Sequence, residues 1–473
     1  MQAPSSWLAT IPPMPPPFPD AALPADTPLA AAAMPPRREA FAFWLKLGFI
    51  SFGGPAGQIA VMHEELVERR RWISEQRFLH ALNYCMLLPG PEAQQLATYV
   101  GWLMHRTLGG IVAGGLFVLP SLFLLIGLSW IYMAFGHVPS IAGVFHGIKP
   151  AVTALVLHAA WRVGSRTLTN GWLSSIALAS FVALFVLHLA FPLIVLLAAA
   201  AGALGGRLAP EKFRRGVAGG GVSGTHAPAL IDDASPVPAH ARHAWPRALR
   251  IGAAFVALWG GAIAALATTT GWHGTLTQMA WFFTKTAWLG FGGAYAILPY
   301  VMQGGVDHYH WLSAAQMMDG LALGETTPGP LIMVVAFVGF VGGWTQAVFG
   351  PGDLALAGAA AATVVTFFTF LPSFFFILVG GPVIESTHGN LKFTAPLTGV
   401  TAAVVGVIVN LAAFFALHVL WPHGAGGRFD AAALVIGAAA AVALFRLRSG
   451  VIPVIAGAAL AGLLLALAGV AAP

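Results

Sequence analysis

Long apolar stretches dominate the chain, and short polar segments that carry most of its charge separate them. Apolar runs of about 18 residues or more cover residues 111–135, 173–203, 251–270 and 431–470, the last interrupted near Ser449. As helices, runs of this length cross a bilayer whose hydrocarbon core is about 30 Å thick. We therefore expect an all-α, polytopic membrane protein.

Composition supports this expectation. Hydrophobic residues make up 58% of the 473 positions and charged residues only 8%, against about 25% charged residues in a typical soluble protein. The net charge of +6 comes from basic residues in the short connections, where they set topology, so we expect no nucleic-acid partner. The single cysteine, Cys85, excludes an intrachain disulfide and a cysteine-based metal cluster.

The same order of motifs occurs twice along the chain. Lys46 and Phe52 recur 239 residues later as Lys285 and Phe291. The same spacing relates Trp72 to Trp311, Ser74 to Ser313, and Pro89-Gly90-Pro91 to Pro328-Gly329-Pro330. Further on the spacing becomes 252 residues, which indicates about 13 extra residues near 342–357 and relates Pro120 to Pro372, Ser121 to Ser373, and Gly147 to Gly399. A register kept across so many Gly, Pro and Trp predicts an internal duplication.

The duplication divides the chain into segments. Residues 1–36 are rich in Pro and Ala and contain no Lys or Arg. A secretory signal begins with a basic region, so we expect a disordered tail here instead. The two transporter repeats are expected at 37–206 and 273–473. Between them we predict a flexible, basic cytoplasmic linker at 207–247 and a connecting transmembrane helix at 248–272.

The basic residues predict a topology, because they favour the cytoplasmic side of a membrane. A full crossing by the first apolar segment would place the arginines at 69–71 outside, whereas a re-entrant hairpin broken at 52–55 keeps them inside. A second hairpin is expected to break at 89–91. The connecting helix then starts the second repeat on the opposite side. We therefore predict two repeats of inverted topology with broken helical hairpins, a plan that secondary transporters use.

Each break combines Gly with Pro or Phe. Proline ends a helix, glycine permits positive φ and close backbone approach, and a new helix N-terminus presents N–H groups that favour an anion. An isolated break is often only a kink, but paired and duplicated breaks indicate function. The predicted substrate-binding positions are Phe52, Gly53, Gly54, Pro89, Gly90 and Pro91, and in the second half Phe291, Gly292, Gly293, Thr327, Pro328, Gly329 and Pro330.

Two lysines occupy equivalent places in the repeats. Lys46 and Lys285 each stand six residues before the first break of their half. A lysine within an apolar stretch is costly unless it is paired or functional, and a compact ammonium suits an oxyanion. We expect both lysines in the substrate site. The alternative is a lysine whose ammonium extends to the membrane interface.

Two carboxylates stand near the second break of each half. Glu92 follows one Pro-Gly-Pro motif and Glu325 precedes the other. Intramembrane carboxylates often carry protons or pair with a cation, so both residues are candidates for coupling transport to protons. The alternative is an ion pair with Lys46 or Lys285 that only holds the hairpins together.

Enzyme chemistry finds little support in the sequence. His63, Glu64, His146 and His158 lack the spacing of a nucleophile–base set or a metal cluster. The phosphate-binding motif of ATP-driven pumps, Gly-x-x-x-x-Gly-Lys-Ser/Thr, is also missing from the sequence. We expect no catalytic residues, no metal site and no cofactor.

The motifs resemble those of the chromate ion transporter family in its long, two-domain form. The resemblance extends from about Phe41 through nearly the whole chain. Its most specific pieces are Phe49-Ile-Ser-Phe-Gly-Gly-Pro55, Trp72-Ile-Ser74, Leu88-Pro-Gly-Pro-Glu-Ala-Gln-Gln-Leu96, Thr326-Thr-Pro-Gly-Pro330 and Phe337-Val-Gly-Phe340.

The resemblance implies a bacterial inner-membrane protein that exports chromate, driven by the proton-motive force, and so confers chromate resistance. Transport of sulfate or another oxyanion is the alternative, because chromate and sulfate are both tetrahedral dianions of similar size. The expected partners are this anion and the lipid bilayer, with protons as a candidate coupling ion and a homodimer as a candidate assembly.

Overall fold

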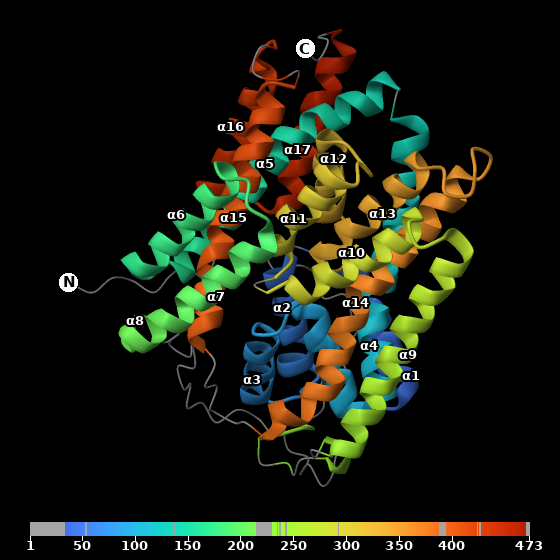
Figure 1. The fold of residues 1–473 in the computed structure, drawn as a ribbon, viewed down its shortest axis with the longest axis vertical. Coiled ribbons are helices and arrows are strands. Elements are labelled where there is room, and N and C mark those ends of the chain that lie inside the picture. Colours follow the sequence, from blue (N-terminus) through green and yellow to red (C-terminus); the bar gives the residue numbers. More distant parts are fainter. Residues whose placement is uncertain are drawn as a thin grey trace. The chain divides into compact units, whose positions relative to one another are not determined.

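The computed structural model describes residues 34–469 apart from 53, 137, 214–228, 234, 236–237, 242–243, 292, 387–393, 423 and 425–426. Within the described residues every regular element is helical, and the one β-bridge is an isolated parallel pairing of Ile73 with Ile231 (Figure 1). Six helices there are long and apolar enough to cross a membrane: α4 (Glu92–Phe135), α5 (Pro139–Thr167), α7 (Phe191–Leu208), α9 (Trp245–Thr270), α14 (Leu354–Ser386) and α15 (Thr394–Leu420). The predicted all-α, polytopic membrane protein is confirmed.

The second half of the chain runs through the same order of elements as the first. Before α4 the first half has α1 (Arg37–Ile50), α2 (Gly54–His63), the π-helical turn η1 (Glu64–Arg69) and α3 (Glu75–Cys85), and after α5 it has α6 (Gly171–Phe185), α7 and the short α8 (Pro210–Phe213). The second half has α10 (Thr275–Leu289), α11 (Ala294–Met302), the π-helical turn η3 (Gln303–His308), α12 (Ala314–Thr326), η4 (Leu331–Met333), α13 (Val334–Thr345), α14, α15, α16 (Ala431–Phe445) and α17 (Val451–Leu467). The short η2 (Ala239–Ala241) and the long α9 join the two halves.

Irregular backbone features recur at the same spacing as the sequence motifs. The two π-helical turns, η1 and η3, begin 239 residues apart, and the next helix in each half is N-capped by Ser74 or Ser313. Arg71 and His310, also 239 residues apart, both adopt positive φ, at 50° and 52°. Because non-glycine residues seldom adopt positive φ, the duplication extends to the details of the backbone.

Helix α4 folds back on itself rather than running straight. Its 44 residues would extend about 66 Å as one straight helix, twice the thickness of a bilayer core. The backbone leaves helical geometry at His105 and at Arg106, whose φ is +59°. Beyond this turn Gly109 lies against Gly101, where an added Cβ on Gly101 would stand 2.6 Å from the Gly109 carbonyl oxygen. Residues 92–104 therefore form a short arm that packs antiparallel to a long helix from 107.

The arms before the long helices are too short to cross a membrane. Helices α1 and α3 have 14 and 11 residues, and their counterparts α10 and α12 have 15 and 13. At 1.5 Å per residue none of these arms spans a hydrocarbon core of about 30 Å. Their lengths suit the re-entrant hairpins that we predict from the charges; the side from which each hairpin enters stays a prediction.

The long helices of the two halves exchange partners. Helix α5 packs against α16 and α17 of the other half, and α15 packs against α6 and α7 (Figure 1). Glycines allow both crossings: a Cβ on Gly147 would lie 2.1 Å from the carbonyl oxygen of Ala458, and a Cβ on Gly399 would lie 2.4 Å from that of Ala198. The two glycines are 252 residues apart, so these two close backbone contacts are related by the repeat.

Part of the linker packs against the first half of the chain. Ile231 is buried, and its N–H donates to the Trp72 carbonyl at 3.1 Å. The hydroxyl of Ser74 donates to Asp233 at 2.5 Å, and a guanidinium nitrogen of Arg77 donates to the Ser235 carbonyl at 2.7 Å. The Gly-Gly-Gly sequence at 219–221 lies outside the described residues.

The glycine crossings lead to a stability prediction. We expect Gly147→Ala to lower the free energy of unfolding by about 2 kcal/mol, because the new methyl group meets the backbone of α17, which has no rotamer to change. Gly127→Ala in α4 is the matched control, since a Cβ there meets nothing within 4 Å. Thermal unfolding of the purified variants in detergent measures the difference. Equal stability of the two variants would contradict the crossing.

Candidate functional site

The first break has the same backbone conformation in both halves. Helix α1 ends in a three-residue turn in which the Phe52 N–H donates to the Ile50 carbonyl at 3.0 Å. At the end of α10 the Phe291 N–H donates to the Leu289 carbonyl at 2.9 Å. These are inverse γ-turns, which occur where a helix or strand stops.

The arm that follows each turn starts with a glycine at positive φ. Gly54 has φ +68° and Gly293 has φ +89°. Of the predicted binding residues around these turns, Phe52 is exposed, Phe291 is half-buried and Gly293 is buried, whereas Gly53 and Gly292 lie outside the described residues. In each half one residue, Ser51 or Gly290, lies between the end of the helix and the phenylalanine. Because the helix has ended, the carbonyl of this residue can accept a hydrogen bond from outside the helix.

The freed carbonyls bind the Pro-Gly-Pro break of the opposite half. The Gly329 N–H donates to the Ser51 carbonyl at 2.8 Å, and the Gly90 N–H donates to the Gly290 carbonyl at 3.0 Å. Donors and acceptors are each 239 residues apart, so the two bonds are copies of one another. The two bonds join the four breaks in two pairs across the halves. We call the described residues of these pairs the break cluster: 51, 52 and 54 with 328–330, and 290, 291 and 293 with 89–91.

Two serines of the long helices α4 and α14 lie next to the glycines of the break cluster. A Cβ on Gly90 would lie 2.5 Å from Ser373 Oγ, and a Cβ on Gly329 would lie 2.7 Å from Ser121 Cβ. Both glycines have positive φ, +117° and +101°. A larger residue at either position would clash with a serine and would also have to adopt a strained positive φ. This explains why glycine occupies both positions.

The prolines start new helices at the cluster. Pro89, Pro91, Pro328 and Pro330 are buried, and Pro91 and Pro330 are the N-caps of α4 and η4. The first-turn N–H groups of such helices have no acceptor within the helix. The N–H groups of Gly90 and Gly329 already donate to carbonyls, so the first turns, and not these two glycines, offer donors to an anion.

Buried glutamines add polar groups to the cluster. The Gln58 amide donates to the Gly329 carbonyl, and the Gln95 amide donates to the Pro89 carbonyl at 2.8 Å. The side-chain oxygens of Gln94, Gln95 and the hydroxyl of Ser121 are buried without a hydrogen-bond partner among the described residues. Buried polar atoms of this kind mark a place that a ligand or water completes. Neither Gln58 nor Ser121 is among the binding residues that the sequence predicts.

The two lysines have different surroundings. Lys46 is half-buried on α1, whereas Lys285 is exposed on α10. Identical positions in the repeat therefore differ in contact with solvent or lipid. Their role in the substrate site stays a prediction.

The two carboxylates also differ. Glu325 is buried at 6% exposure and accepts a hydrogen bond from the Tyr295 hydroxyl. Glu92 is half-buried in the first turn of α4, where its Oε1 would stand 3.0 Å from a Cβ on Gly293. Thr327 is buried, and its hydroxyl donates to the Gly324 carbonyl at 3.1 Å, one turn back in α12. Glu92 and Glu325 thus both lie beside the break cluster, on helices that begin or end there.

A buried ion pair joins the halves away from the cluster. Arg77 of α3 and Glu385 of α14 lie 3.4 Å apart, nitrogen to oxygen, and each side chain is 3% exposed. The Tyr99 hydroxyl donates to the same carboxylate. No local pattern in the sequence indicates this contact, because the two charges are 308 residues apart.

Comparison with known proteins also distinguishes the two halves of the chain. Residues 38–204 and 277–463 both match the chromate transporter family, one match for each half. The chain belongs to the chromate transporter family. This multi-pass membrane protein is 34% identical to the chromate transport protein of Pseudomonas aeruginosa, over 78% of each chain, and 29% identical to that of Cupriavidus metallidurans, over 79% of this chain and 81% of the relative.

A shorter relative matches only one half. The uncharacterized transporter YwrB of Bacillus subtilis is 29% identical over 36% of this chain and 87% of its own length. This relative is therefore about as long as one repeat of the present chain. These relatives are named as transport proteins, which points to a transporter rather than an enzyme. No solved structure matches the chain.

The buried ion pair leads to a second prediction. We expect Arg77→Met to destabilise the protein by about 3 kcal/mol, because Glu385 would stay buried without its cation. The double variant Arg77→Met/Glu385→Gln should recover most of that loss, since no uncompensated charge remains. A double-mutant cycle from thermal unfolding measures the coupling. Additive effects of the two substitutions would show that the charges do not interact.

Proposed function

We propose that this protein exports chromate across the bacterial inner membrane, with its N-terminus in the cytoplasm, and thereby gives chromate resistance. The observation that supports the proposal most is the break cluster, where the four interrupted helices of two repeats meet through reciprocal backbone hydrogen bonds. In secondary transporters with inverted repeats, substrate sites lie where discontinuous helices meet. Relatives over most of this chain's length are named chromate transport proteins.

An oxyanion fits the chemistry of the cluster. Four helical segments, α2, α4, α11 and η4, begin at the breaks. Each helix N-terminus contributes N–H donors and about half a positive charge, so together they favour a dianion. Lys46 and Lys285 would add attraction from the preceding arms. Irregular backbone at membrane depth is tolerated where protein buries it or where it lines a watery cavity, as a transport path requires.

The membrane potential is a sufficient driving force for export. One elementary charge that crosses the membrane gains about 2.3 kcal/mol per 100 mV. A dianion that leaves a negative interior therefore gains about 4.6 kcal/mol per 100 mV, which supports a concentration ratio of roughly three orders of magnitude. Protons carried by Glu92 or Glu325 would change the net charge moved, and hence the share of the proton-motive force that is used.

The duplicated hydrogen bonds suggest how the site changes its access. If the second repeat is inverted relative to the first, the Ser51–Gly329 bond and the Gly290–Gly90 bond face opposite sides of the membrane. If one of these hydrogen bonds breaks while the other stays intact, the anion is exposed to one side of the membrane at a time. This is the alternating access of such carriers. Sulfate is the competing substrate, because backbone donors and ammonium groups bind both tetrahedral dianions.

Flux in proteoliposomes tests the function. We expect the purified protein to move chromate out of vesicles whose interior is negative, faster as the potential rises, and sulfate to compete for the site. Gly90→Ala and Gly329→Ala should each reduce the flux at least tenfold, since the methyl group meets a serine at a strained backbone position. Gly261→Ala in α9, where a Cβ meets nothing within 4 Å, is the matched control.

The flux measurements distinguish between the identity of the substrate, the carrier function and the role of the two lysines. Sulfate flux without chromate flux would reassign the substrate, and no flux of either anion would refute an oxyanion carrier. Lys46→Ala and Lys285→Ala belong in the same experiment. Full flux in both lysine variants would remove the lysines from the site and leave the carrier intact.

A further inference from the structure

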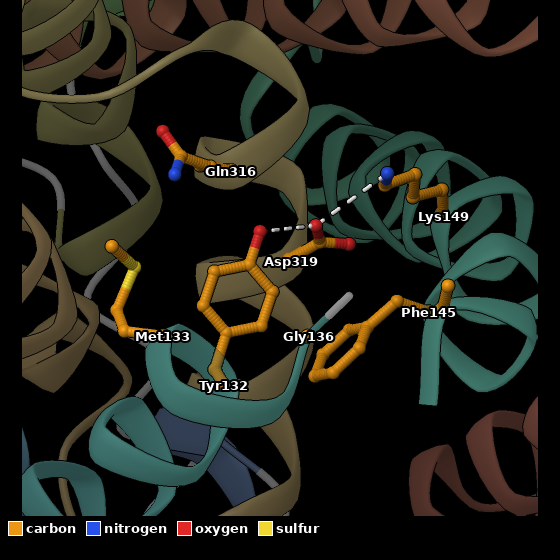
Figure 2. A pocket seen from close by; sticks show the side chains of 8 residues that line it. Tyr132, Met133, Gly136, Phe145, Lys149, Gln316 and Asp319 are labelled. Atoms are coloured by element: carbon orange, nitrogen blue, oxygen red, sulfur yellow. Dashed lines mark hydrogen bonds and ion pairs between the residues drawn. The ribbon is translucent and has the colours of Figure 1, made fainter. Parts of the chain in front are cut away.

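A pocket separate from the break cluster lies between α4, α5 and α12 (Figure 2). Its volume is about 330 Å³, and it is lined by Tyr132, Met133, Gly136, Ala142, Phe145, Lys149, Gln316 and Asp319. Helices α4 and α5 come from the first half and α12 from the second, so both halves build its wall. None of the break residues lines it.

The pocket contains one cation held by one carboxylate. Lys149 Nζ lies 3.5 Å from Asp319 Oδ2, and the Tyr132 hydroxyl donates to the same oxygen at 2.9 Å (Figure 2). The Asp319 side chain is 3% exposed, whereas that of Lys149 is 25% exposed. Asp319 Oδ1 is buried without a hydrogen-bond partner among the described residues. An ammonium has three donors, so Lys149 keeps capacity for another acceptor from the pocket.

The repeat-related place in the molecule is closed. At the spacings of 239 and 252 residues, Gln316 corresponds to Arg77 and Met133 to Glu385. There the Arg77–Glu385 ion pair fills the space, and the linker covers it through the bond from Arg77 to the Ser235 carbonyl at 2.7 Å. One of two equivalent positions is therefore sealed by paired charges, and the other is open and presents a partly exposed lysine.

We propose that Lys149 is a second binding point for the transported oxyanion, at which the anion displaces the carboxylate of Asp319. This inference rests on the function proposed above. The anion would gain the Lys149 ammonium and the donors of Tyr132 and Gln316, which line the same pocket. Asp319 acts as an internal counter-anion that pairs with Lys149 whenever the substrate is absent.

Competition from Asp319 gives the pocket a use in transport. A binding point on a transport path has to attract the ion and also release it. A built-in carboxylate that returns to Lys149 speeds the release, because the departing anion then leaves no unpaired cation in the pocket. The lysine therefore attracts the oxyanion without trapping it.

Binding of radiolabelled chromate and sulfate to purified protein tests the inference. Asp319→Asn removes the competitor but keeps the shape, so we expect about fivefold tighter binding, the range of a partly exposed ion pair. Lys149→Gln/Asp319→Asn removes both charges together and should bind more weakly than Asp319→Asn by tenfold or more. Lys149→Arg keeps the cation and should bind like the wild type.

A measurement on the wild-type protein avoids dependence on the folding of the variants. Acetylation by an amine reagent, followed by mass spectrometry, reports the reactivity of Lys149 and of Lys212, an exposed lysine that serves as control. Saturating sulfate or chromate should slow acetylation of Lys149 severalfold and leave Lys212 unchanged. Unchanged reactivity of Lys149, or a double variant that binds as tightly as Asp319→Asn alone, would overturn the inference while wild-type flux still upholds the carrier. A wild type that neither binds nor moves an anion would refute both.

Discussion

Two backbone hydrogen bonds between the halves are the contacts on which the rest of the structure depends. A helix interrupted inside a membrane exposes backbone N–H and C=O groups that lipid cannot satisfy. Here the Ser51 and Gly290 carbonyls receive the N–H groups of Gly329 and Gly90. Each half thus supplies what the breaks of the other half lack. A buried polar cluster and a close pairing of the repeats follow from this single requirement.

The tight pairing of the repeats follows from small residues at the crossings. Gly147 and Gly399 let α5 and α15 approach the helices of the opposite half to within backbone contact. Between lipid-facing helices there is little hydrophobic driving force, so close packing and polar contacts provide the association. A carrier that changes access must rearrange such contacts as units. The polar contacts at the break cluster and in the Lys149 pocket are the ones that an ion can compete for.

Much of the fold could be predicted from the sequence, because the duplication repeats its Gly, Pro and Trp positions at constant spacing. That spacing located the breaks, and the lengths of the arms agree with hairpins. The Arg77–Glu385 and Lys149–Asp319 pairs could not be predicted. Their members lie far apart in sequence and have no like-charged counterparts in the other repeat. The different burial of Lys46 and Lys285 is likewise set by tertiary packing, which cannot be inferred from the residues next to each lysine in the sequence.

The location of bound chromate tests the central claim most directly, namely that the break cluster holds the transported anion. Chromium scatters X-rays anomalously, so a crystal of the protein grown with saturating chromate would reveal the ion by its own signal. The account predicts an ordered chromium site among the first turns that follow Pro91 and Pro330, beside Glu92. Ordered chromate elsewhere in the protein, with the break cluster empty at saturation, would contradict it.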